Sequence, residues 1–464
     1  MFELRPYQTN ALNKIRSEYA QDNKKVLLHL ATGAGKTVIF CEVLKGAHLK
    51  GKSAIMIVRG RKLVDQAHKR LAKYNVPHGV LMAGHKLFKP NEAIQICSID
   101  TLISRKLKPK ADIIVIDETH LATSDGYKNF LSGYPESYIL AVTATPYTEK
   151  SLRHVADKIV MPISVSELIK LGYLAPPKYY APNIPDLTGV KTTNTSEGRD
   201  YKHDDLSAVM ENSVLMGDIA THWLELAKGR PTIAFCVGVQ HSKQLTEYLN
   251  TRGIRAAHVD ASSSDEARQG FINQLENGEL DILCNCGILC VGVDIPKVSC
   301  IILARPTKSL NLHIQQIGRG TRPLPEKDNF IVLDHAGNLF RHGFITDEHE
   351  ATLDVVEDKK VKVRSVTMCT ICYAAFYGSI CPQCGNQVES TRKSFQSIDG
   401  NLKEIKPEDI DPVNVFIKKM KVIQKANGYK RGWVYFKLVD KFGEEVANKY
   451  MPKREVPAWV FRSP

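Results

Sequence analysis

The sequence contains no apolar run long enough to cross a membrane, and its first residues include no apolar signal-peptide core. These absences argue against a membrane or secreted protein and predict a cytoplasmic one. Short internal repeats and low-complexity tracts are also missing, which argues against a repeat architecture. With 464 residues, 43% of them hydrophobic and 24% charged, the chain is long enough for two or three globular domains with separate cores.

The eleven cysteines of an intracellular chain indicate thiols or a metal site rather than disulfides. Most of them are scattered through apolar segments, and we interpret Cys284, Cys286 and Cys290 as small buried side chains. The last four form two CxxC pairs with eight residues between the pairs: Cys369, Cys372, Cys381 and Cys384. This pattern predicts a structural Zn²⁺ site, because four thiolates leave no open position for a substrate water. Four free cysteines are the alternative.

The net charge of +13 indicates a polyanionic partner, with a basic solvated surface as the alternative. Residues 391–464 carry 16 Lys and Arg against 9 Asp and Glu, so +7 of this charge lies in the last part of the chain. Basic and aromatic residues are interleaved there around Lys430, Arg431 and Trp433, which suits phosphate contacts combined with base stacking. The same run could instead be a strand that packs Trp433 and Tyr435 into a small core.

A glycine-rich turn lies between an apolar run and a helical pattern, and it reads Ala31-Thr32-Gly33-Ala34-Gly35-Lys36-Thr37. Strand, glycine turn, Lys-Thr and helix is the layout of a P-loop, which binds nucleotide phosphates at a helix N-terminus. In this interpretation Lys36 reaches the β- and γ-phosphates and the Thr37 hydroxyl binds Mg²⁺. The strict pattern has a glycine where this chain has Leu30.

A second apolar run ends in two carboxylates, Asp117 and Glu118, followed by Thr119 and His120. Asp117 is placed to hold Mg²⁺, and Glu118 is placed to orient and deprotonate an attacking water. A strand that stops in a polar turn would look the same. The upstream P-loop favours the catalytic interpretation, because the carboxyl ends of parallel strands converge at one edge of a sheet.

The order of the expected elements predicts two copies of one α/β architecture. Residues 1–147 alternate strands with helices, and the expected strands are 25–30, 53–58, 94–98, 112–117 and 138–142. The proline-rich stretch 148–215 is expected to be a linker with a surface excursion. Residues 216–350 alternate again, with expected strands at 231–236, 255–259, 281–286, 299–303 and 329–334. A zinc module at 365–390 and a basic C-terminal region at 391–464 follow.

Three further segments carry polar side chains near strand ends. Ala141 to Pro146, with sequence AVTATP, ends a strand with the hydroxyls of Thr143 and Thr145. GVDIP, at residues 292–296, follows an expected strand, and QQIGRGTR spans residues 315–322. Arginines of the last motif, aimed at phosphates on the other domain, would act as an arginine finger, although a solvated basic turn has the same composition.

RPYQ at residues 5–8, ATGAGKT, DETH, TATP, GVDIP and QQIGRGTR occur in the order and spacing of superfamily 2 helicases, and this resemblance covers residues 2–345. LRPYQ, ELIKLGYLAPP at 167–177, IVLDHAGN at 331–338 and the later cysteine-rich segment are most similar to RadD-like DNA repair helicases, which are related to XPB-type and UvsW-type helicases. The resemblance implies an α/β fold with two tandem RecA-like parallel-sheet domains. A small zinc module with four cysteine ligands and a basic C-terminal domain would follow them.

The resemblance also implies roles for residues that match the motifs. It assigns adenine recognition to Arg5 and Gln8, and the coupling of hydrolysis to movement to His120 and to Thr143 or Thr145. Gly292 and Asp294 would contact ribose or signal to the nucleic acid. The catalytic set it implies is Lys36, Asp117, Glu118, Gln315, Arg319 and Arg322. The nucleic-acid contacts we expect are Arg59, Ser98, Thr101, Lys430, Arg431 and Trp433.

These features predict a monomeric, ATP-dependent DNA helicase or translocase that uses ATP, Mg²⁺ and Zn²⁺. It would act in DNA repair, recombination or replication on duplex or branched DNA, with repair or replication proteins as partners, in a bacterial or phage-infected cell. An RNA helicase is one alternative, since the motifs do not separate the two polymers. An ATP-switched scaffold that binds nucleic acid without unwinding it is the other.

Overall fold

The computed structural model describes most of residues 3–354 and several shorter segments beyond them. Within 3–354 the undescribed residues are 148–149, 182–184, 196–197, 211–212, 291–292 and 294. Beyond 354 the described residues are 366–368, 375–377, 379–380, 385, 387, 404–405, 413, 416–417, 420–421, 424 and 432–451. The cysteines of the expected zinc site, together with Gly292, Asp294, Lys430 and Arg431, therefore lie outside the described residues.

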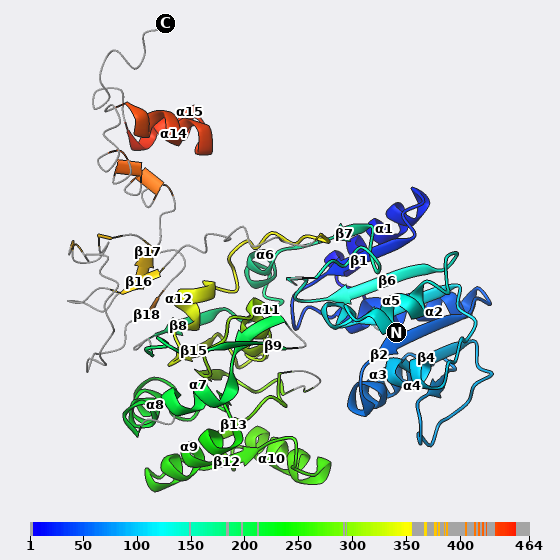
Figure 1. The fold of residues 1–464 in the computed structure, drawn as a ribbon, viewed down its shortest axis with the longest axis horizontal. Coiled ribbons are helices and arrows are strands. Elements are labelled where there is room, and N and C mark those ends of the chain that lie inside the picture. The colour runs from blue at the N-terminus through cyan, green and yellow to red at the C-terminus, as the bar shows by residue number, and fades with distance from the viewer. Residues whose placement is uncertain are drawn as a thin grey trace, which may run out of the picture.

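The first domain is a parallel sheet covered by helices on both faces (Figure 1). Its strands, in spatial order, are β3 (Gly79–Leu81), β4 (Ile94–Ser98), β2 (Ala54–Val58), β5 (Ile113–Asp117), β6 (Tyr138–Thr143), β1 (Lys25–His29) and β7 (Lys158–Val160). Its helices are α1 (Pro6–Ala20), α2 (Lys36–Leu49), α3 (Arg61–Lys73), α4 (Ile99–Ser104), α5 (Asp125–Leu131) and the 3₁₀ turn η1 (Thr119–Leu121). All five strands expected in this part of the sequence are confirmed to within one residue.

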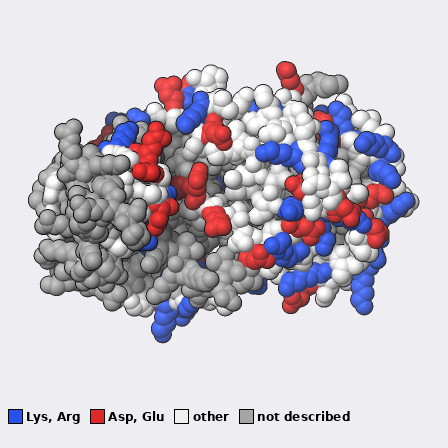
Figure 2. Space-filling model, turned by 90° about the horizontal axis from the view of Figure 1, so that it is seen from above, with Lys and Arg blue, Asp and Glu red and all other residues white. Residues whose placement is uncertain are grey.

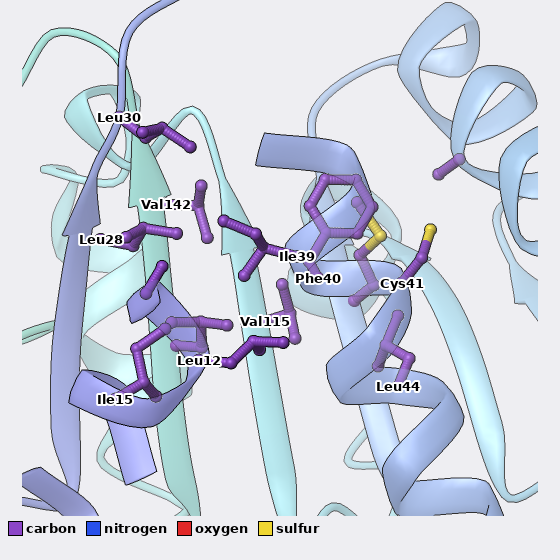
Figure 3. Packing of buried hydrophobic residues seen from close by; sticks show 14 of the residues in the cluster. Leu12, Ile15, Leu28, Leu30, Ile39, Phe40, Cys41, Leu44, Val115 and Val142 are labelled. Atoms are coloured by element: carbon purple, nitrogen blue, oxygen red, sulfur yellow. The ribbon is translucent and has the colours of Figure 1, made fainter. Parts of the chain in front are cut away.

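Alternate side chains of the buried strands enter two separate cores, one on each face of the sheet. Leu28 and Leu30 pack against α1 and α2 beside Phe40, and Figure 3 shows this face with Val115 and Val142 of the neighbouring strands. Leu27, which directly precedes Leu28, points to the opposite core. The near-continuous apolar sequence of β1 is explained by burial on both faces.

The second domain repeats this plan. Its strands, in spatial order, are β12 (Ala256–Val259), β13 (Ile282–Asn285), β11 (Thr232–Cys236), β14 (Cys300–Ala304), β15 (Phe330–Asp334), β8 (Pro177–Tyr180) and β18 (Glu404–Ile405). All neighbours are parallel except β18, which pairs antiparallel with β8. Its helices are α8 (Ser213–Leu226), α9 (Val239–Thr251), α10 (Asp265–Asn277), α11 (Leu310–Ile317) and α12 (Asn338–His342). The five strands expected here are again confirmed to within one residue.

The stretch 148–215 is more than the expected linker, because it supplies a strand to each sheet. β7 pairs with β1 of the first sheet, and β8 pairs with β15 of the second. These strands are only three and four residues long, and Pro177 opens β8, so neither shows the alternation by which strands are recognised in a sequence. The remaining elements of the stretch are α6 (Val165–Lys170), the hairpin of β9 (Thr192–Thr195) and β10 (Gly198–Tyr201), and α7 (His203–Met210).

Within the expected zinc module the structure describes β16 (Val366–Met368) paired with β17 (Ala375–Tyr377), and within the C-terminal region it describes helices α14 (Trp433–Phe442) and α15 (Glu444–Tyr450). The alternative interpretation of this run is wrong about the strand, because Val434, Tyr435 and Leu438 follow a helical period and form the buried side of α14, but its small core with Tyr435 inside is confirmed. Phe436 is 47% exposed, and Trp433 is half-buried against this small core. No helix among the described residues is long and apolar enough to span a membrane.

Candidate ATP site at the interface of the two domains

The P-loop, the DETH motif and the TATP motif follow three adjacent strands of the first sheet. β6 lies between β1 and β5, with His29 opposite Thr143 and Asp117 opposite Val142. Because the strands are parallel, all three motifs emerge at the same carboxyl edge. The sheet order therefore brings together the residues that the sequence spaces across more than a hundred positions.

The P-loop has the backbone conformation that its glycines predict. Gly33 and Gly35 have φ values of +84° and +82°, a region that favours glycine, and Gly35 directly precedes the first residue of α2. A Cβ atom on Gly35 would lie 2.5 Å from Nε2 of Gln8. The turn therefore places backbone N–H groups and a helix N-terminus at one point, which is the arrangement that binds phosphate.

The N-terminal motif lies directly on this turn. Gln8 is buried and accepts a hydrogen bond from the Arg5 backbone N–H at 3.0 Å. The Tyr7 hydroxyl donates to the Ala34 carbonyl at 2.8 Å, and its ring packs on Tyr173 with the centroids 5.1 Å apart. The Arg5 guanidinium lies 4.7 Å from the centroid of the same Tyr173 ring. Sequence reasoning missed Tyr7 and Tyr173, although both lie in the segments LRPYQ and ELIKLGYLAPP.

The charged groups of the site are buried and influence one another. Burial lowers the pKa of the Lys36 ammonium, whose Nζ lies 3.3 Å from the Leu30 carbonyl oxygen. Burial also raises the pKa of Asp117 to about 6, and the negative charge of Glu118 raises it further. Glu118 itself has a φ of +49°, rare for a residue with a side chain, as is typical of strained functional positions. A bound divalent cation would reverse the effect on Asp117, so this carboxylate fits a Mg²⁺ site.

The Thr37 hydroxyl, the other expected Mg²⁺ ligand, accepts a hydrogen bond at 2.9 Å from Arg70 of α3. The positive charge of Arg70 also acts to lower the pKa of Asp117, although burial is the larger effect. Arg70 is a further basic residue of the site that no sequence motif indicated. Its only signal is its position on a helix that packs beside α2.

A hydrogen-bonded chain crosses from the first domain to the second. His120 Nδ1 lies 3.1 Å from Thr143 Oγ1 and 3.5 Å from a carboxylate oxygen of Glu118. Gln315 of α11 places its amide nitrogen 3.2 Å from His120 Nε2 and 3.3 Å from Thr145 Oγ1. Burial lowers the pKa of His120 to about 4, so its imidazole is neutral at pH 7 and can donate from one nitrogen while accepting at the other.

The GRGTR turn of the second domain lies against the P-loop. The Thr321 hydroxyl donates to the Thr32 carbonyl at 3.3 Å, and a Cβ atom on Gly33 would lie 3.2 Å from Thr321 Oγ1. Arg319 and Arg322 donate to the carbonyl oxygen of Val293, a residue of their own domain, at 2.5 and 3.2 Å respectively. Both arginines also lower the pKa of Lys36, after the larger effect of burial, so their charges lie near the phosphate-binding turn.

The expected nucleic-acid residues of the first domain have different environments. Arg59 is exposed at the carboxyl end of β2, as a phosphate contact would require. Ser98 and Thr101 are buried, and the Thr101 hydroxyl accepts a hydrogen bond from the Ala83 backbone N–H at 3.1 Å. In this conformation Ser98 and Thr101 are packing residues, and of these three only Arg59 presents its side chain to solvent.

Two family models match the chain, one for each domain. Residues 1–148 match the res subunit of type III restriction enzymes, and residues 216–323 match the helicase conserved C-terminal domain. With the two parallel sheets and the ordered motifs, these matches define the class of protein. The chain belongs to the superfamily 2 helicases.

Among curated proteins, the chain is 30% identical to the putative ATP-dependent helicase IRC3 of Saccharomyces cerevisiae, over 72% of this chain and 51% of that protein. It is 26% identical to a 51.5 kDa protein of a Lactococcus phage, over 82% of both chains. It is also 29% identical to the DNA 3'-5' translocase XPB2 of Sulfurisphaera tokodaii, over 36% of this chain and 33% of that one. The chain thus spans about half the length of the yeast relative.

Solved structures share the fold at lower identity. A fragment of a putative HsdR subunit of a type I restriction enzyme from Vibrio vulnificus superposes with a TM-score of 0.58 and 20% identity, over 73% of this chain and 67% of that one. The type ISP restriction-modification enzyme LlaBIII bound to DNA superposes with a TM-score of 0.53 and 15% identity, over 72% of this chain and 28% of that one. These two structures share the two-domain fold with this chain.

Proposed function

We propose that the protein is an ATP-driven translocase or helicase that acts on DNA. The single observation that carries this proposal is Gln315, which reaches across the interface to His120 and Thr145. One residue of the second domain thereby contacts two of the three nucleotide motifs of the first. A nucleotide-dependent shift in these motifs would change how the two domains pack, and such a shift is how a motor of this class moves along a strand.

In this proposal the residues of the site divide the chemistry among them. The P-loop backbone and Lys36 bind the phosphates, Glu118 orients and deprotonates the attacking water, and Arg319 and Arg322 supply positive charge to the transition state. Mg²⁺, when bound by Thr37 and Asp117, would neutralise charge that develops on the phosphates. Arg5 and Gln8 lie beside the P-loop where they can contact the base of the nucleotide.

DNA is our choice of polymer because several relatives are described by DNA chemistry. The matched family includes restriction subunits, and one relative is described as a DNA 3'-5' translocase. The RadD-like sequence features extend the proposal to repair, recombination or replication on duplex or branched DNA, by a cytoplasmic monomer. On the face shown in Figure 2, Lys and Arg alternate with Asp and Glu on the described residues, so the mixed charge there does not by itself identify the DNA-binding surface.

ATPase activity across a panel of nucleic acids tests the proposal. We expect turnover to rise with duplex, forked or four-way DNA and to stay at its basal level with RNA of matched length. Stimulation by RNA but not DNA would replace the proposal with an RNA helicase. The absence of any stimulation, with tight ATP-dependent binding, would favour an ATP-switched scaffold.

The composition of residues 365–464 adds a zinc site and a DNA-binding role to this proposal. We infer one Zn²⁺ per chain from the two CxxC pairs, and elemental analysis of protein purified without chelator would measure it. Removing residues 391–464 should weaken DNA binding and flatten its salt dependence, because fewer phosphates are contacted. Equal salt slopes for the truncated and complete chains would contradict this role.

A further inference from the structure

A segment of the second domain returns to the first one. We call residues 344–354 the strap. It begins in the core of the second domain, where Phe344 and Ile345 are buried and the Ile345 N–H donates to the Tyr179 hydroxyl at 3.2 Å. It ends in a core of the first domain, where Leu353 is only 5% exposed. Figure 1 shows it as the yellow chain that leaves α12 and runs past α6 toward β7.

The end of the strap is held by several contacts at the segment that precedes β7. The Leu353 carbonyl accepts hydrogen bonds from the Leu152 N–H at 2.8 Å and from the Ser151 hydroxyl at 3.1 Å. The Arg153 guanidinium donates to both carboxylate oxygens of Asp354, at 2.8 and 2.7 Å. A buried leucine, two hydrogen bonds and a bidentate ion pair together specify one docking site.

The middle of the strap contacts the nucleotide motifs. The rings of His349 and Tyr147 have centroids 5.5 Å apart, and those of Tyr147 and His29 are 5.8 Å apart. Tyr147 directly follows the TATP motif, and His29 is the last residue of β1 before the P-loop. His29 Nε2 also lies 3.2 Å from the carbonyl oxygen of Ala144 in the TATP motif. The strap thus packs on Tyr147 and, through it, on His29. We call these two residues the Tyr147–His29 support of the P-loop and the TATP motif.

The chain has already crossed between the domains once before the strap. Leu174 belongs to a core of the first domain, and the next residue, Ala175, belongs to the core of the second and donates to the Thr321 carbonyl at 2.8 Å. Two bodies joined at one point can rotate about any axis through it. A second attachment at the strap leaves one axis, the line through the two crossings, which is a hinge.

We propose that the strap is a second tether that confines the two motor domains to one hinge motion and positions the Tyr147–His29 support of the nucleotide motifs. The inference rests on the proposed motor function.

Docking of the strap is tested first, without ATP or nucleic acid. In Asp354→Arg, two guanidiniums face each other and the strap should leave its site. Amide hydrogen exchange in a peptide that covers Leu152 should then accelerate several-fold. The reversed pair, Arg153→Asp with Asp354→Arg, should restore protection. Glu136→Arg is the matched control, because it reverses one partner of another exposed ion pair of the first domain, with Lys24 at 2.7 Å.

ATP hydrolysis is the second readout. We expect Asp354→Arg to lower kcat several-fold and to leave the KM for ATP nearly unchanged, since the P-loop is intact but Gln315 contacts His120 and Thr145 less often. The reversed pair should recover kcat together with amide protection, which would tie the loss of kcat to undocking of the strap rather than to either substitution by itself. Accelerated exchange with unchanged kcat would overturn the coupling, and unchanged exchange would overturn the docking. A wild-type protein that nucleic acid does not stimulate would instead contradict the proposed function.

Discussion

The interdomain hydrogen bonds of Gln315 allow a quantitative prediction. Replacing Gln315 with alanine removes the contacts to His120 Nε2 at 3.2 Å and to Thr145 Oγ1 at 3.3 Å. Gln315 is 3% exposed, so water does not replace its amide while the domains are together. The closed arrangement loses two hydrogen bonds, whereas each domain by itself loses little.

Two buried neutral hydrogen bonds of about 0.5–1.5 kcal/mol each give a loss of about 1–3 kcal/mol in the closed state. At about 1.4 kcal/mol for each factor of ten, the ratio of closed to open molecules should fall by roughly 5- to 150-fold. Because Gln315 is not part of the P-loop, we expect this loss in kcat rather than in the KM for ATP.

Steady-state ATPase with saturating DNA measures the effect. Gln269→Ala is the control, because it removes a glutamine side chain that bonds Asn273 at 2.9 Å on an exposed helix of the same domain. Thr145→Val in the Gln315→Ala background should cost less than Thr145→Val alone, since the shared contact is already gone. A kcat within twofold of wild type, or fully additive effects, would refute the bridging role of Gln315.

The remaining predictions concern the chemical step, the phosphate turn and acid stability. Glu118→Gln should abolish turnover and keep ATP binding, and normal hydrolysis by this variant would remove Glu118 as the base. Gly35→Ala should weaken ATP binding more than tenfold, because Cβ would meet Gln8 Nε2 at 2.5 Å, whereas Gly51→Ala shares the positive φ but meets nothing within 4 Å. Burial lowers the pKa of five histidines to about 4 or 3, so the stability that is fully present above pH 6.5 should fall as the pH is lowered to 5 and the unfolded chain takes up protons. These histidines are His29, His120, His241, His335 and His342. Equal midpoints of urea unfolding at pH 7 and pH 5 would contradict this prediction.

Much of the fold could be predicted from the sequence because its strands are buried on both faces. An uninterrupted apolar run such as 25–30 or 113–117 is visible locally, and the motif that follows it marks the carboxyl end. β7 and β8 could not be predicted this way, since each is a short strand whose partner lies far away in sequence. At helix α14 the sequence fits two patterns. Trp433 and Tyr435 alternate as in a strand, whereas Val434, Tyr435 and Leu438 follow a helical period.

The P-loop and the carboxylates of the site were predictable, since local spacing defines them. Several tertiary contacts of the site were not. Thr321 and Arg70 reach the P-loop, and Tyr173 packs on Tyr7 beside it, and no spacing rule connects these residues to the motif. Arg319 and Arg322 were expected at the phosphates. Their hydrogen bonds to the Val293 carbonyl show that an arginine in a motif can also stabilise its own turn.

The interface provides contacts through which ATP chemistry would drive domain movement in the proposed motor. Thr32 of the P-loop, Thr145 of the TATP motif and Tyr147 just beyond it contact Thr321, Gln315 and His349 of the second domain, respectively. The three contacts lie on different segments of the second domain, so no single loop can shift without disturbing its partner. Because the cores on both sides are close-packed and resist small deformations, such a shift is taken up by rotation of the domains as units. The same packing that forms the nucleotide site would thus convert its chemistry into motion.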